Sequence, residues 1–112
     1  MRNNIFIAIG RVKSDAQTRT NSNGTEFTTF SIIVSDLEVI SGEPSEVNET
    51  FDFLAYGNTA ITAKKIAKRG QSLTVNAHIK SFVDANQNKR YLFIADSVGL
   101  NIISHIDKSV IS

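Results

Sequence analysis

The 112-residue sequence has no cysteine, no tryptophan and a single proline. Without cysteine the chain can form neither a disulfide framework nor a thiolate metal site. No stretch reaches the roughly eighteen apolar residues that a membrane-spanning helix needs. The apolar run from Ile5 to Ile9 stops at Gly10-Arg11 without a small-residue cleavage site, which indicates a strand and not a signal peptide. These absences predict a soluble, cytoplasmic protein that does not bind a membrane.

The sequence does contain an uneven distribution of charge, although the formal net charge is only +1. The segment from Asp36 to Asp52 holds six acidic residues and no Lys or Arg, whereas the remainder holds all twelve basic residues and five acidic ones. This separation is compatible with a basic face for a polyanion and an acidic loop held away from it.

Hydrophobic periodicity predicts strands at residues 4–12, 25–35, 49–56, 72–80 and 89–98. One helix is expected at residues 59–68, capped by Asn58 and ended by Gly70. The polar stretches 13–24 and 37–47 are predicted loops. Five strands with a helix between the third and fourth is the layout of an OB-fold, a mainly β, partly open barrel that binds oligonucleotides or oligosaccharides. We expect one such domain over residues 1–100 and a short C-terminal extension at residues 101–112.

Three local patterns occur in a fixed order along the chain. The first is Gly10-Arg11-Val12 with Asp15, Arg19 and Asn23-Gly24, the second is Tyr56-Gly57-Asn58-Thr59-Ala60 with Lys68-Arg69-Gly70, and the third is Phe82-Val83-Asp84 with Arg90-Tyr91. In this order the sequence resembles the bacterial and phage single-stranded DNA-binding proteins from about Asn4 to Val98. The resemblance implies sequence-independent binding and protection of single-stranded DNA in replication or recombination, by a homo-oligomer (a dimer or tetramer) that needs no cofactor.

The resemblance also implies a set of DNA-binding residues. The candidate stacking platforms are Tyr56, Phe82 and Tyr91, and the candidate phosphate partners are Arg11, Lys13, Arg19, Lys80 and Arg90. Aromatic platforms in a basic groove suit single strands because every base has a π-face. Phosphate contacts from Lys and Arg add a salt-sensitive term that does not depend on sequence.

The chain departs from the family pattern in two ways. It has Thr50 and Phe82 where the family carries tryptophan at stacking positions. It also ends at Ser112 without the Gly-rich linker and acidic tip of cellular members, which resembles a short, phage-encoded form. These departures leave open an OB-fold accessory protein that mainly recruits replication or recombination proteins. An oligosaccharide-binding or purely structural OB-fold and an RNA ligand are further alternatives.

Several other residues are expected to have structural roles only. Phe27, Phe30, Phe51 and Phe53 are predicted core residues. Tyr56, by contrast, has the opposite strand parity to Phe51 and Phe53, which turns its side chain outward or toward the groove. The Lys64-Lys65-Lys68-Arg69 cluster is interpreted as a solvated helix face. His78 and His105 have no second histidine at metal-ligand spacing, so neither a metal site nor an enzyme is predicted.

Overall fold

The computed structural model describes residues 3–101, which form six strands and one helix. The strands are β1 (Phe6–Val12), β2 (Gln17–Thr20), β3 (Glu26–Ile40), β4 (Glu43–Ala55), β5 (Ser72–Val83) and β6 (Lys89–Leu100), and the helix α1 (Gly57–Ile66) lies between β4 and β5. No helix of this described part is long and apolar enough to cross a membrane. The expected C-terminal extension, residues 101–112, lies outside the described residues apart from Asn101.

The strands form one sheet in the order β1-β5-β6-β4-β3-β2, and an additional β1–β3 pairing closes five of them into a barrel. Closure occurs where Arg11 and Val12 pair with Ile33 and Ile32. At this crossing Gly10 lies so close to the Ile33 carbonyl that a Cβ at position 10 would overlap its oxygen. The predicted OB-fold barrel, with one short helix before its last two strands, is therefore confirmed.

The core follows from the alternation of side chains along the strands. Phe30 and Ile32 of β3 and Phe53 of β4 are almost completely buried, and the rings of Phe30 and Phe53 stack with centroids 5.3 Å apart. Each such ring contributes on the order of 1.5–3 kcal/mol by leaving water. Of the four predicted core phenylalanines, Phe51 is only partly buried against this cluster, and Phe27 lies outside it.

The helix begins two residues earlier than the sequence predicts, and the predicted cap at Asn58 is wrong. Tyr56 occupies the N-cap position in an extended conformation without a capping hydrogen bond from its side chain, and Gly57 at φ 57° starts the first turn. Glycine tolerates this left-handed backbone, so the chain can turn directly from β4 into α1. Ala63 and Ala67 are fully buried.

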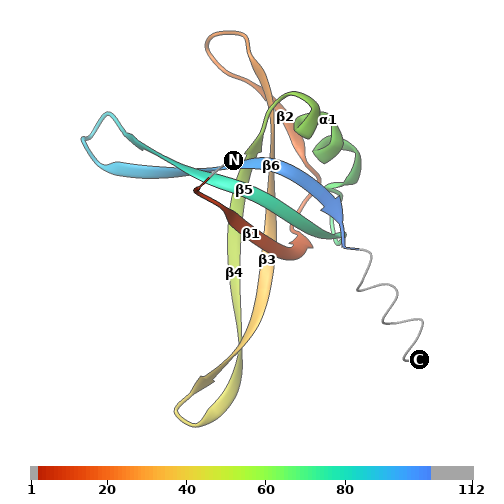
Figure 1. The fold of residues 1–112 in the computed structure, drawn as a ribbon, viewed down its shortest axis with the longest axis vertical. Coiled ribbons are helices and arrows are strands. Elements are labelled where there is room, and N and C mark those ends of the chain that lie inside the picture. Colours follow the sequence, from red (N-terminus) through yellow and green to blue (C-terminus); the bar gives the residue numbers. More distant parts are fainter. Residues whose placement is uncertain (1–2, 102–112) are drawn as a thin grey trace.

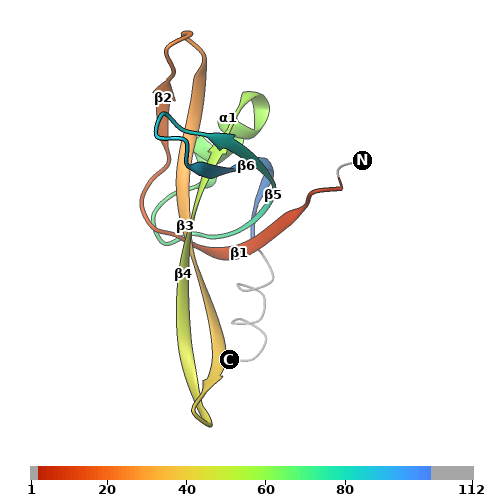
Figure 2. The ribbon, with the colours of Figure 1, turned by 90° about the vertical axis from the view of Figure 1, so that its left-hand side faces the viewer.

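Three hairpins extend from the barrel in different directions: β2–β3, β3–β4 and β5–β6 (Figure 1, Figure 2). Two of them correct the predicted loops. Residues 37–47 form the end of the β3–β4 hairpin, which pairs as far as Ile40↔Glu43, and residues 17–20 form β2 on the edge of β3. The Ser-Gly-Glu-Pro signal marks only the turn at Ser41 and Gly42, which adopt positive φ.

Candidate nucleic-acid interface

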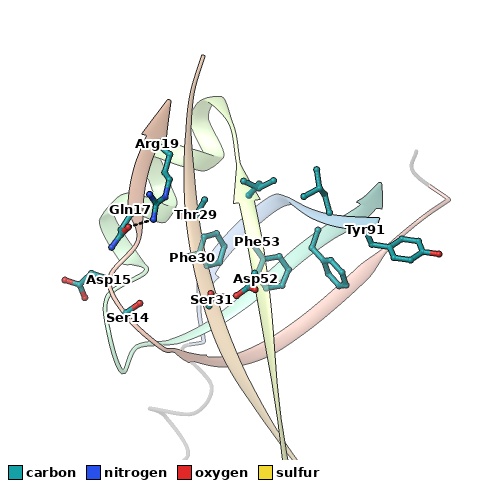
Figure 3. Close-up of a pocket in the computed structure, with 13 residues that line it drawn as sticks. Ser14, Asp15, Gln17, Arg19, Thr29, Phe30, Ser31, Asp52, Phe53 and Tyr91 are labelled. Carbon is teal, nitrogen blue, oxygen red and sulfur yellow. Dashed lines mark hydrogen bonds between the residues drawn. The ribbon is translucent and has the colours of Figure 1, made fainter. Parts of the chain in front are cut away.

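An open groove of about 620 Å³ lies between the β2–β3 hairpin and strands β4 and β6 (Figure 3). Its lining residues come from every one of these strands and from the loop before β2: Ser14, Asp15, Gln17, Arg19, Thr29, Phe30, Ser31, Asp52, Phe53, Leu54, Tyr91, Leu92 and Phe93. Cationic, aromatic, apolar and hydroxyl side chains therefore meet in one groove, which suits a ligand with flat rings and charged groups.

Strand β2 contributes Arg19, the basic residue among the lining residues of this groove. Arg19 pairs with Phe27 of β3, and its Nη2 donates a hydrogen bond to Gln17 Oε1 at 2.9 Å. A guanidinium has five N–H donors, so most of them remain for an anionic ligand. Figure 3 shows Arg19 and Gln17 side by side at one side of the groove and Tyr91 at the other.

Two carboxylates also line the groove, and both have donors within the protein. Asp15 Oδ1 accepts a hydrogen bond from the backbone N–H of Arg69 at 2.8 Å, and Asp52 accepts one from the hydroxyl of Ser31. These carboxylates lower the local positive potential, so binding here cannot depend on charge alone.

The β5–β6 hairpin supplies two exposed rings near its turn. Tyr91 pairs with Ser81, and Phe82 pairs with Arg90, one pair nearer the turn. Directly opposed residues share a face and successive residues alternate, so Phe82, Arg90 and Lys80 lie on one face of the arm and Tyr91 on the other. Both rings are exposed, Phe82 by 44% and Tyr91 by 58%.

The turn of this hairpin is held by Asp84. Its carboxylate accepts hydrogen bonds from Arg90 Nε at 2.8 Å and from the backbone N–H groups of Asn88 and Asn86 at 2.9 Å each. The bond from Arg90, followed by those from the turn backbone, lowers the pKa of Asp84 below its ordinary value. Lys89 lies over the Tyr91 ring, with its Nζ 5.8 Å from the centroid.

Tyr56 lies where β4 ends and α1 begins, with 43% of its surface exposed. Of the two orientations that strand parity predicts, outward or toward the groove, the exposure of the ring fits the outward one, and Tyr56 is not a lining residue of the groove. The ring does not stand alone, because the half-buried Phe27 packs against it with centroids 5.9 Å apart. Sequence reasoning assigns Phe27 to the core, whereas the structure places its ring beside a candidate stacking platform.

The eight predicted DNA-binding residues are all exposed but do not form one cluster. Arg19 and Tyr91 line the groove, and Lys13 is bonded through its backbone N–H to the carbonyl of Ser31, a lining residue. Lys80, Phe82 and Arg90 lie along the β5–β6 arm. Arg11 is on β1 at the closure of the barrel, where its Nη1 is 3.5 Å from the carbonyl oxygen of Gly70.

Sequence reasoning misses the polar and aliphatic lining of the groove: Gln17, Thr29, Ser31, Asp52, Leu54 and Leu92. The sequence does contain a signal that could have identified Thr29 and Ser31. These residues alternate with the buried Thr28, Phe30 and Ile32 along β3, so their side chains lie on the opposite face of the strand. Gln17 could not be found, since its strand reads as a polar loop and forms by pairing with β3.

The histidine in the described residues has a structural environment. His78 is 6% exposed, and its Nδ1 lies 3.0 Å from both carboxylate oxygens of Asp96. Among residues 3–101 no group of three metal-ligating side chains gathers. His105 lies outside the described residues.

The barrel topology and the groove place the protein among OB-folds with an open binding face. The model of the single-strand binding protein family matches residues 3–99, and the chain belongs to this family. Membership in a family of binding proteins agrees with the expectation that the protein is not an enzyme. No curated protein sequence matches the chain.

Solved structures with the same fold include the small single-stranded DNA-binding protein of Streptomyces coelicolor, with TM-score 0.66 and 18% identity over 92% of this chain and 99% of that one. The wild-type single-stranded DNA-binding protein of Thermus aquaticus has TM-score 0.72 and 17% identity, and a deletion mutant of it has TM-score 0.74 and 16% identity. In both Thermus cases 87% of this chain matches 49% of the other, so the chain spans about half of those proteins.

Proposed function

We propose that the protein binds and protects single-stranded DNA without sequence preference during replication or recombination. The observation that carries this proposal is the groove between Arg19 and Tyr91 in a member of the single-strand binding family. Bases stack on Tyr91 and on the exposed Tyr56 and Phe82, and the arginine and lysine side chains neutralise phosphates.

Two contributions to the binding free energy, base stacking and phosphate neutralisation, agree with this arrangement. Each base stacked on an aromatic side chain contributes about 1–3 kcal/mol, as judged by alanine substitution, whatever the base. Phosphate neutralisation by Lys13, Arg19 and Lys80 releases counterions, so affinity falls as salt rises. The exposed aromatic and basic residues together supply stacking and phosphate neutralisation. Neither contribution needs hydrogen bonds to base edges, so neither depends on the base sequence.

Fluorescence anisotropy of a labelled oligo-dT tests the proposal, with duplex DNA and RNA of the same length as competitors and with salt varied. Binding that weakens with salt and prefers the single DNA strand supports it. Preference for RNA would identify a different nucleic acid, and absence of binding at low salt would refute it.

We further propose that the protein acts as a homo-oligomer assembled through β1. Ile5, Ile7 and Ile9 are each at least half exposed on one side of the chain. Strand β1 pairs with β3 only at Arg11 and Val12, so the edge from Phe6 to Gly10 that faces away from β5 has no strand partner within the described residues. Light scattering after size exclusion should give a dimer or tetramer that Ile7→Asp dissociates.

A second candidate function, recruitment of replication or recombination proteins, is favoured by the β3–β4 arm. Leu37 and Val39 near its tip are 79% and 75% exposed among acidic neighbours. An apolar, acidic surface suits a basic protein partner and repels DNA. If recruitment is the main function, the wild type binds oligo-dT only weakly. Leu37→Ser/Val39→Ser then abolishes binding of the protein partner and leaves the affinity for DNA unchanged.

A further inference from the structure

A second groove, of about 500 Å³, lies between the β2–β3 hairpin and helix α1, which stand next to each other in Figure 1. The hairpin contributes Thr18, Glu26, Phe27 and Thr28, and the helix contributes Gly57, Asn58, Ala60, Ile61, Lys64 and Lys65. None of the residues predicted from the sequence to bind DNA lines this groove.

The cationic side of the second groove is formed by two lysines of α1. Lys64 Nζ donates a hydrogen bond to Thr18 Oγ1 at 2.7 Å, which uses one of its three donors. The Lys65 Nζ forms no hydrogen bond or ion pair with the described residues. Both side chains are exposed, and Glu26 is the one acidic residue among the lining residues. The lining therefore has an excess of positive charge.

This arrangement divides the basic cluster that the sequence suggests is a uniform solvated face. Lys64 and Lys65 line the groove, whereas Lys68 and Arg69 follow the end of α1 and do not. Ile61, 57% exposed, adds an apolar surface beside the two lysines. An apolar floor with cations at its side suits the sugars, bases and phosphates of a nucleic acid strand better than a small ion.

Phe27 and Tyr56 lie next to residues of both grooves. Phe27 pairs directly with Arg19, which lines the first groove, and Phe27 itself lines the second. Tyr56, whose ring contacts that of Phe27, precedes Gly57, another residue of the second groove. A strand that continues from Arg19 past Phe27 and Tyr56 would reach the residues of the second groove.

We propose that the second groove is an additional single-stranded DNA subsite, in which the strand continues from the first groove past Phe27 and Tyr56 to α1. Lys64 and Lys65 neutralise phosphates there, and Ile61 and Ala60 contact sugars or bases. This inference rests on the proposed function, because it extends the path of the same ligand.

The test compares two double variants of the full chain that remove equal charge from the same cluster. Lys64→Gln/Lys65→Gln empties the groove of cations, and Lys68→Gln/Arg69→Gln is the matched control. Affinity for oligo-dT of about 4 and about 16 nucleotides, the range of OB-fold site sizes, is measured across salt concentrations. Lys65→Gln alone keeps the Lys64–Thr18 hydrogen bond, so a loss of affinity in this variant cannot come from the loss of that bond.

We expect Lys64→Gln/Lys65→Gln to weaken binding of the long oligonucleotide roughly 25-fold at 0.1 M salt and to lower its log–log salt slope by about 1.4, since each phosphate contact to a single strand contributes about 0.7. Lys65→Gln should lower the slope by about half as much. The short oligonucleotide and the control variant should show no such change.

Equal effects of the two double variants, no effect of either, or equal weakening of the short and long oligonucleotides would overturn the second subsite while leaving the proposed function in place. Failure of the unmodified protein to bind either oligonucleotide would instead overturn the proposed function, and the second subsite with it.

Discussion

Two hairpins leave the same barrel, one continuing β3 and β4 and the other continuing β5 and β6 (Figure 1). Each is an antiparallel ribbon; the β3–β4 register is unbroken from Thr28↔Ala55 to Ile40↔Glu43, and the β5–β6 register is unbroken from Ala77↔Ala95 to Val83↔Lys89. The β3–β4 arm, residues 35–48, has the acids Asp36, Glu38, Glu43 and Glu46, with no basic or aromatic residue. The β5–β6 arm, residues 80–92, has Lys80, Lys89 and Arg90, one acid, and the rings of Phe82 and Tyr91.

The difference shows that backbone geometry supplies only the reach of an arm, and side chains decide what it meets. Both turns place residues at positive φ, and both arms expose large side chains because nothing in the described chain covers them. Under the proposed function, a strand of DNA is attracted to the cations and rings of one arm and repelled by the carboxylates of the other. Four predictions test this contrast, in order of decreasing effect.

The largest effect is expected from the rings. Phe82→Ala and Tyr91→Ala should each weaken oligo-dT binding by about 5- to 150-fold, because each removes a stacking contact of about 1–3 kcal/mol. Anisotropy titration measures the change, and Leu37→Ala on the β3–β4 arm is the matched control, expected to have no effect. The contrast fails if Leu37→Ala weakens binding as much as the ring variants do.

A smaller effect is expected from Lys80→Gln. Losing one phosphate contact to a single strand should lower the log–log salt slope by about 0.7 and weaken binding about fivefold at 0.1 M salt. A salt series of titrations measures the slope. Lys68→Gln removes the same charge outside both grooves and should leave the slope unchanged; a fall of equal size would assign the effect to net charge alone.

A still smaller effect is expected from Glu38→Gln/Glu46→Gln on the β3–β4 arm. Exposed charges beyond about 10 Å are largely screened at 0.1 M salt, and these glutamates do not line either groove. DNA affinity should therefore change by less than about twofold at 0.1 M and tighten only near 0.01 M, where the screening length is about 30 Å. Strong tightening at 0.1 M would mean that the acidic arm competes with DNA.

The smallest effect concerns the pH dependence of the β5–β6 turn. Because Arg90 and the turn backbone lower the pKa of Asp84 in the folded protein, the carboxylate stabilises the turn above the ordinary pKa of Asp. That stabilisation is lost as pH falls through the lowered pKa. The measurement is hydrogen exchange of the Asn86 and Asn88 backbone amides in the wild type and in Asp84→Asn. As pH falls through this acidic range, the exchange rate in the wild type should rise relative to the rate in the variant. Identical pH profiles would refute this role for Asp84.

Much of the fold could be predicted because its signals are local. The alternation of apolar residues fixes the barrel strands, and Phe30 and Phe53 occupy the core as their parity requires. The β3–β4 arm could not be predicted from local sequence. Its acidic residues and its Ser-Gly-Glu-Pro turn signal favour a loop, and they outweigh the strand-like alternation of Leu37, Val39 and Val47. Its pairing is a continuation of the barrel register, which no single segment reveals.

The candidate site divides in the same way. Sequence resemblance selects Arg19, Tyr56, Phe82 and Tyr91, and all are exposed. It could not show that Phe27 packs on Tyr56, that Phe82 and Tyr91 lie on opposite faces of their arm, or that Lys64 and Lys65 line a groove. Each of these facts depends on a cross-strand register or on the position of α1 beside β2.

The sequence by itself determined the class of fold, the burial of Phe30 and Phe53 and the residue types available for DNA, since strand period and composition are properties of the chain. Only the tertiary structure decided which of these residues meet. Arg19 and Tyr91 are brought to one groove by β2–β3 pairing and by the parallel contact of β4 with β6, and such long-range pairings leave no local signal.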